Sequence, residues 1–296
     1  MHTRGNIRLG KTVGASVGNL AVLLAILSAA PPDGQLVRAR LIADRVSIQP
    51  GQAFRVGVLM EMRDGWHVYW QHPGDSGLPT TVRFTWPDGF SAGGLHWPVP
   101  QLFTQPGDVT GIGYGRSLLL WTQVTAPAHL RPSDRITIRA TAQWLACKDS
   151  CVAGETDLKL ELPVAHASEP ANTQLFETWQ GRLPVEPSKA AHVKAIQFGG
   201  DAEAGRPVIH LTWNEPVRDV QCFVDPGDRL LAKDPTVQTD GTQTTVRLEM
   251  KPLDRTQSLP ATVDAVVAYT DAAGQRHGLA VVVPLARQTQ EVNRTK

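Results

Sequence analysis

Apolar side chains recur at every second position in several short stretches of this chain. The stretch 54–62 (FRVGVLMEM) places Phe54, Val56, Val58, Met60 and Met62 on one face. Within 244–251, three apolar residues alternate with three charged ones in the same way. A period of two is the pattern of a β-strand with one buried face, and no long stretch shows the period of a helix. The pattern therefore predicts an all-β protein.

Further short segments of strand character follow one another, with turn-forming clusters such as 72–77 (HPGDSG) and 86–89 (WPDG) between them. Strands spaced in this way are typical of an antiparallel β-sandwich. The predicted strands are 54–62, 66–70, 81–86, 117–125 and 136–145 in the first half, then 208–213, 217–223, 244–251, 261–270 and 279–285 in the second.

One segment between these two series is different. In 167–181, Leu175, Phe176 and Trp179 have helical spacing, and Gly181 can end a helix there. We therefore predict a first β-domain over 36–164, a linker with one short helix over 165–188, a second β-domain over 189–286 and a tail over 287–296.

The N-terminus has the pattern of a targeting segment. Arg4, Arg8 and Lys11 form a positive region, the apolar run 20–27 (LAVLLAIL) follows, and small residues at 28–30 offer a cleavage site. The uncharged stretch 12–32 is also long enough for an uncleaved membrane anchor. Either interpretation of residues 1–30 places the rest of the chain outside the cytoplasm, where disulfides form.

Composition narrows the choice of partners. The formal net charge of the 296 residues is +1, so charge does not indicate binding to nucleic acid or to an anionic membrane surface. His67, His72 and His96 lie near the aromatic stretch 66–70 (WHVYW) and are candidates to line a site, although we expect surface or packing roles for them. The sequence contains three cysteines. We expect Cys222, in a predicted strand, to be a buried free thiol.

Cys147 and Cys151 lie between two alternating segments, 136–145 and 157–162, as at the narrow end of a hairpin. Facing Cα atoms in a hairpin are about 4.5–5.5 Å apart, a separation that a disulfide accepts. The pair has three interpretations: a structural bond, a metal site or a redox pair.

Magnitudes favour the redox pair. A five-residue ring contributes only about 2 kcal/mol of loop entropy, and a domain of this size does not need it. Zinc usually takes four ligands, and no histidine lies within several residues of the pair. Cu(I) accepts two thiolates, so copper stays open as the metal alternative. An exposed, tight disulfide is of the kind that exchanges readily.

The stretches "DGWHVYWQHPGDSGLPT", "GYGRSLLL" and "WLACKDSCVAGE" together resemble the N-terminal extracytoplasmic region of the DsbD/ScsB-type transmembrane disulfide reductases. The resemblance covers most of residues 36–165 and, more loosely, the second β-domain. It implies two immunoglobulin-like antiparallel β-sandwiches in tandem. In that family a cysteine pair takes electrons from a membrane-embedded or thioredoxin-like partner and reduces disulfides of periplasmic proteins.

Carried over residue by residue, the resemblance assigns the redox pair to Cys147 and Cys151. It places Tyr69 beside the pair and assigns the segment 103–114 (FTQPGDVTGIGY), with Phe103 and Tyr114, to a cap over it. We read this segment as a long Gly- and Pro-rich loop between strands. Trp144 is a further site-lining candidate, although Trp66, Trp70 and Trp144 also suit the core. No cofactor and no metal ligand are assigned.

Two features depart from the family. Its best-known branch has a wider cysteine spacing, and full-length members continue into a multi-span membrane part and a thioredoxin-like domain. We therefore expect either separate partners for this chain or a different role. The favoured function is periplasmic protein-disulfide reductase chemistry, relaying electrons between a membrane or thioredoxin-like partner and substrate proteins. The alternative is a non-catalytic β-sandwich module that binds a protein partner or Cu(I) and has a structural disulfide.

The N-terminal pattern leads to one prediction. The protein should be recovered from the extracytoplasmic fraction, either soluble or bound to the inner membrane, because a positive region followed by an apolar run directs export. Cell fractionation measures this. Recovery of the folded protein from the cytoplasm would contradict the predicted location and remove the setting for disulfide chemistry.

Overall fold

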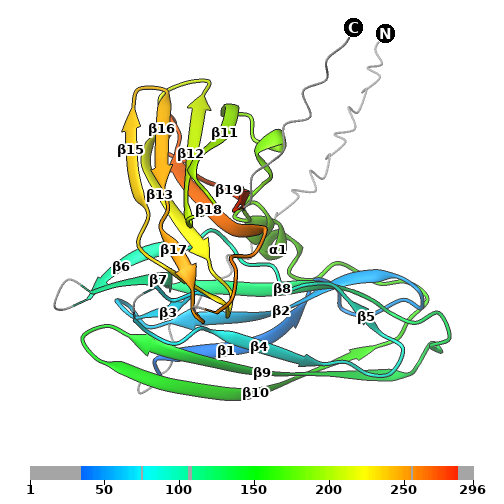
Figure 1. The fold of residues 1–296 in the computed structure, drawn as a ribbon. Helices are drawn as coiled ribbons and strands as arrows, with labels where there is room; N and C mark the ends of the chain where they lie inside the picture. The colour runs from blue at the N-terminus through cyan, green and yellow to red at the C-terminus, as the bar shows by residue number, and fades with distance from the viewer. Residues whose placement is uncertain (1–34, 75, 106–108, 255, 286–296) are drawn as a thin grey trace, which may run out of the picture.

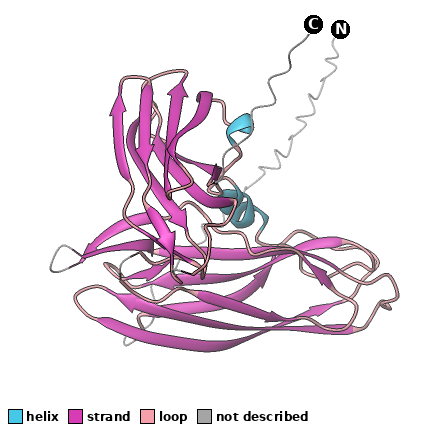
Figure 2. Cartoon of the chain, in the orientation of Figure 1, coloured by secondary structure: helices cyan, strands magenta, loops and turns pink. Residues whose placement is uncertain are grey.

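The computed structural model describes residues 35–74, 76–105, 109–254 and 256–285 (Figure 1). Strands dominate this part of the chain (Figure 2), so the all-β prediction is confirmed. Among the described residues, no helix has the length and apolar character needed to cross a membrane. The predicted targeting segment, 1–30, and the tail, 287–296, lie outside the described residues.

Ten strands build a first sandwich from two antiparallel sheets. One sheet has the order β1-β2-β8-β5, and the other has the order β10-β9-β3-β7-β6, with β4 also paired to β9. The strands are β1 Val37–Ala43, β2 Ala53–Met62, β3 His67–Tyr69, β4 Thr81–Thr85, β5 Ser91–Ala92, β6 Gln101–Gln105, β7 Val109–Gly115, β8 Ser117–Thr125, β9 Arg135–Cys147 and β10 Cys151–Pro163.

A second strand group, β11 to β19, follows. Its sheets have the orders β11-β12-β16-β15, β13-β18-β19 and β14-β17. These strands are β11 Val193–Asp201, β12 Arg206–Trp213, β13 Arg218–Asp225, β14 Leu230–Ala232, β15 Thr236–Asp240, β16 Gln243–Arg247, β17 Met250–Pro252, β18 Thr262–Thr270 and β19 Arg276–Pro284. The second group has its own cluster of buried apolar residues. The exact division of the chain into two domains stays a prediction.

The predicted helix is present as α1, Thr173–Gln180, and a short 3-10 helix, Pro187–Lys189, follows it. Phe176 and Trp179 are the buried residues of α1 and belong to the core of the first sandwich. The Gly181 N–H donates to the Glu177 carbonyl and ends the helix. The linker is therefore packed against the first sandwich.

The two strand groups also touch directly, with α1 near the junction (Figure 1). Asp225 in β13 forms an ion pair with His72 and accepts a hydrogen bond from Gln71 Nε2 at 2.5 Å. Arg276 donates to the Pro100 carbonyl at 2.9 Å. Phe223 of the second group is buried in the apolar cluster of the first. These contacts join the second strand group to the segment that follows β3 and to the segment that precedes β6.

Two sequence predictions about local structure were wrong. The segment 103–114, expected to be a long loop, is largely the hairpin of β6 and β7, and residues 106–108 of it lie outside the described residues. The single strand predicted over 244–251 is divided into β16 and β17, which pair with different strands. The whole of β1 and the whole of β11 were also not among the predicted strands.

The glycines that suggested a loop have a different role in β7. Gly113 lies directly opposite Tyr69 of β3. A Cβ atom added to Gly113 would lie 2.0 Å from the carbonyl oxygen of the preceding residue, Val68. The backbones of β3 and β7 therefore approach closely only because residue 113 has no side chain.

This contact predicts the effect of a substitution. Gly113→Ala should lower the free energy of unfolding by about 1–3 kcal/mol, because the added methyl group forces two paired strands apart. Gly94→Ala is the control, since nothing lies within 4 Å of a Cβ there, and it should change stability by less than about 0.5 kcal/mol. Denaturant unfolding measures both, and equal stabilities would contradict the close packing of β3 on β7.

Candidate functional site

The two cysteines form a disulfide at the narrow end of the hairpin between β9 and β10. Cys147 ends β9, Cys151 begins β10, and they are directly opposite each other in the ladder, with Cα atoms 4.2 Å apart. The Lys148 N–H donates to the Ser150 carbonyl at 3.1 Å and helps to close the turn. The alternation on both sides of the pair thus leads to the predicted hairpin.

The two sulfur atoms differ in access. Cys147 has 0% of its surface exposed, whereas Cys151 and the three turn residues before it are exposed. Thiol–disulfide exchange requires a thiolate to reach one sulfur of the bond. Of the two sulfur-bearing residues, Cys151 is therefore the one that is open to a thiolate from solvent.

The sheet register places a histidine beside the buried cysteine. His67 in β3 is directly opposite Cys147 in β9 and opposite Gly115 in β7. Residues that face each other in a ladder project from the same side of the sheet, and the next residue along projects from the other side. Val68 and Ala146 accordingly belong to the core of the sandwich, so the disulfide and His67 lie on the outer face of this sheet.

Aromatic rings cover this part of the outer face. The Phe103 ring from β6 stacks on the His67 ring, with centroids 4.4 Å apart and planes 9° apart. The Tyr69 ring meets His67 edge-on at 5.4 Å. Gly115 lies against the Phe103 ring, at 3.4 Å from the position of an added Cβ. The absence of a side chain at residue 115 lets Phe103 reach across β7 to His67.

His67 is almost completely enclosed, with 4% of its surface exposed. Its Nε2 atom is buried and has no hydrogen-bond partner among the described residues. Burial lowers the pKa of His67 below its usual value, so the ring is neutral near pH 7. A neutral imidazole has one nitrogen that can accept a proton. The fold thus places a group capable of proton transfer next to the buried cysteine.

The structure brings some of the other predicted site residues to this face and not others. Tyr69 lies on it, fully buried, with its ring against the backbone of Gly77. Tyr114 lies on the opposite face, where its hydroxyl donates to the Pro98 carbonyl at 2.7 Å and burial raises its pKa well above the usual value. Tyr114 is therefore a core residue rather than part of a cover over the pair.

Trp144 is also on the core side of β9. It packs against the core cluster of the first sandwich, and its ring lies over Gly154, the residue opposite it in β10. Trp144 therefore packs on the core side of the hairpin and does not line the outer face.

The remaining histidines of the aromatic region are elsewhere. His72 pairs with Asp225, and the His96 ring lies 4.1 Å from the Trp121 ring. His67 is the functional candidate for which the sequence analysis had favoured a surface or packing role. The signal was the alternation in 66–70, which puts His67 on the same side of the strand as Tyr69.

The third cysteine takes no part in the site. Cys222 is a buried free thiol in β13, as predicted, and burial raises its pKa to about 12. A thiol with so high a pKa carries almost no thiolate at neutral pH and is a poor nucleophile.

Comparison with known proteins agrees with this geometry. Residues 37–163 match the family model described as "Thiol:disulfide interchange protein DsbD, N-terminal". The N-terminal periplasmic domain of ScsB from Proteus mirabilis has a similar fold, with a TM-score of 0.62 and 16% identity over 86% of this chain and 96% of that one.

Other similarities are weaker. The YadV chaperone covers 83% of this chain and 99% of its own, but at 11% identity its TM-score is 0.23, too low to support an argument. No curated protein matches the chain in sequence. The family match contains both cysteines, the aromatic strand β3 and the hairpin of β6 and β7. Residues 37–163 therefore form a domain of the DsbD/ScsB N-terminal type.

Proposed function

We propose that this protein relays pairs of electrons in the periplasm through Cys147 and Cys151, as a protein-disulfide reductase component. The donor would be a membrane-embedded or thioredoxin-like protein, and the acceptors would be disulfides of periplasmic proteins. The observation that carries the proposal is the unequal exposure of the two sulfurs, Cys151 open and Cys147 enclosed, within a domain of this family.

The exchange follows from that asymmetry. A donor thiolate attacks Cys151 Sγ, a mixed disulfide forms, and Cys147 leaves as a thiolate. The second donor thiol then attacks the mixed disulfide, so that the donor is oxidised and both cysteines are reduced. In the forward step, the Cys151 thiolate attacks a substrate disulfide, and Cys147 attacks Cys151 to release the reduced substrate. Two electrons pass in each half of the cycle.

In the proposed exchange, His67 is placed to transfer protons to and from Cys147, the residue whose sulfur departs. Cys147 changes between thiolate and disulfide while enclosed, and an uncompensated thiolate in such a place is costly. The neutral imidazole opposite it accepts the thiol proton when Cys147 attacks, and the imidazolium formed in that step returns a proton when Cys147 leaves as a thiolate. We propose that His67 serves Cys147 in this way.

Among the residues expected to form a cap, Phe103 is the one whose position supports such a role. Its stacking on His67 places an apolar ring over the face on which the disulfide lies. A docking partner that displaces this ring would gain access, while small thiols in solution would be hindered. We propose that Phe103 gates the site in this sense.

The proposed exchange predicts how single cysteine variants behave. Cys147→Ser should form a stable mixed disulfide with an oxidised thioredoxin-like protein, because the exposed Cys151 thiol attacks and no second thiol releases it. Cys151→Ser should form little adduct, because its remaining thiol is enclosed. Non-reducing electrophoresis and mass spectrometry measure the adducts.

The control for these variants is Cys222→Ser, which should exchange like the wild type because the thiol at 222 is buried and protonated. Equal adduct formation by the Cys147→Ser and Cys151→Ser variants, or none by either while both stay folded, would show that the proposed route is wrong.

The proposed gating by Phe103 predicts a change in the rate at which small thiols reduce the disulfide. Phe103→Ala should raise the rate at which glutathione reduces the disulfide by about two- to tenfold, because a stacked ring pair is worth about 0.5–1.5 kcal/mol. Leu102→Ala is the matched control, since Leu102 is the neighbouring residue in β6 and is 46% exposed. Stopped-flow thiol assays measure both rates. If the Phe103→Ala rate matches that of the control, the ring does not restrict access.

A further inference from the structure

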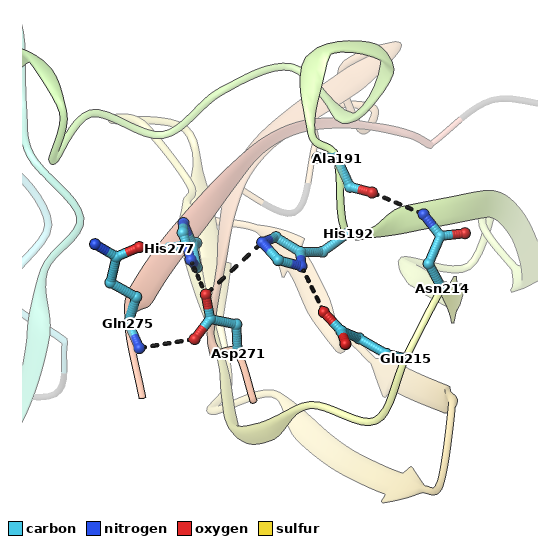
Figure 3. Close-up of polar contacts among 7 residues, drawn as sticks. All are labelled: Ala191, His192, Asn214, Glu215, Asp271, Gln275 and His277. Atoms are coloured by element: carbon cyan, nitrogen blue, oxygen red, sulfur yellow. Dashed lines mark hydrogen bonds and ion pairs between the residues drawn. The ribbon is translucent and has the colours of Figure 1, made fainter. Parts of the chain in front are cut away.

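A second cluster of chemically active side chains lies in the second strand group, apart from the cysteines (Figure 3). It consists of His192, just before β11, Asp271, just after β18, and His277 in β19. One nitrogen or oxygen from each residue lies within 4.8 Å of those of the other two. Three separate parts of the fold therefore converge on one point.

Asp271 is the centre of the cluster and is nearly buried, with 6% of its side chain exposed. Its Oδ1 accepts the Gln275 N–H at 2.8 Å, which fixes the carboxylate. Its Oδ2 faces both rings, with His277 Nε2 at 2.8 Å and His192 Nε2 at 3.7 Å. One carboxylate oxygen and two imidazole nitrogens thus point toward each other.

The His192 ring is held from its other side. Its Nδ1 atom lies 3.3 Å from Glu215 Oε1, which leaves Nε2 turned toward Asp271 (Figure 3). Asn214, next to Glu215, donates to the Ala191 carbonyl at 2.7 Å and ties down the backbone before His192. A carboxylate on the distal nitrogen of a histidine is the usual support of a metal-binding imidazole.

His277 is also oriented by its surroundings. Its ring stacks on that of Tyr269, the residue opposite it in β18, with centroids 5.3 Å apart. Both histidines line a cleft of about 580 Å³ between the second strand group and the first sandwich. The cluster is therefore rigid on its inner side and accessible from the cleft.

We propose that His192 Nε2, Asp271 Oδ2 and His277 Nε2 bind a divalent transition-metal ion of the Zn²⁺ or Cu²⁺ class. Two imidazoles and one carboxylate suit these ions, whereas Mg²⁺ and Ca²⁺ favour oxygen ligands. Three protein ligands leave a fourth position open, and both histidines line the cleft. The site needs no thiol and is independent of the state of the disulfide.

The distances fit such an ion closely. Ligand atoms that lie about 2.0–2.2 Å from one zinc ion are about 3–4 Å from each other. Of the two distances at Asp271 Oδ2, 3.7 Å falls within this range and 2.8 Å is slightly shorter. Small side-chain rotations therefore suffice for binding, and the strands that hold the residues do not have to move.

The test is calorimetric titration of the full oxidised protein with Zn²⁺. The expected result is one equivalent bound, with binding abolished in a His192→Ala, His277→Ala double variant. His210→Ala is the matched control, because His210 is an exposed histidine in the neighbouring strand β12, and it should bind like the wild type. A Cys147→Ser, Cys151→Ser variant should also bind normally, which excludes thiol ligands.

Two further measurements keep the test decisive if the double variant is unstable. Glu215→Gln, a change at a half-exposed side chain, should weaken Zn²⁺ binding by about 10–100-fold, because Glu215 positions the His192 ring. Electron paramagnetic resonance of bound Cu²⁺ should show coupling to two imidazole nitrogens.

The proposal would be overturned if the oxidised wild type did not bind Zn²⁺ or if the double variant bound it as the wild type does. A Cu²⁺ spectrum without nitrogen coupling would also overturn it. Ca²⁺ serves as the probe for non-specific attraction to the carboxylates, and binding of Ca²⁺ as tight as that of Zn²⁺ would equally contradict a site built on histidines.

Discussion

The backbone ladder that joins β9 to β10 and β3 determines where the disulfide lies. Because successive residues of a strand point to opposite faces, a slip of one residue would turn Cys147 into the core and Ala146 outward. The observed register puts Cys147 opposite both Cys151 and His67. The long pairing of β9 with β10, from Arg135–Pro163 to Cys147–Cys151, secures that register far from the turn itself. The position of the Cys147–Cys151 disulfide at the tip therefore depends on the pairing along the whole hairpin.

The second strand group contacts the first sandwich next to the elements that carry the site. Gln71 and His72 follow β3 directly and bind Asp225. Val99 and Pro100 precede β6, where Val99 packs against the backbone of Gly278 and Pro100 accepts from Arg276. The second group thereby braces the end of the strand with His67 and the start of the strand with Phe103. This gives it a physical role in positioning the site.

Alternation in the sequence was sufficient to predict the cysteine hairpin, since apolar and polar residues change places regularly on both sides of the pair. The helix α1 was predictable from the spacing of Phe176 and Trp179. The hairpin of β6 and β7 was not, because its glycines resemble those of a loop. Gly113 and Gly115 are there to admit a neighbouring backbone and the Phe103 ring, and that requirement appears only when the strands are paired. The cluster of His192, Asp271 and His277 was equally hidden, because its members come together only through the fold.

The central claim is that the Cys147–Cys151 bond is a working redox couple rather than a structural link. Its reduction potential tests this most directly and can be measured by equilibration of the protein with thioredoxin or glutathione buffers. We expect a value between about −270 and −120 mV, the range of thiol–disulfide exchange proteins. A value well below about −300 mV, typical of structural disulfides, would contradict the account.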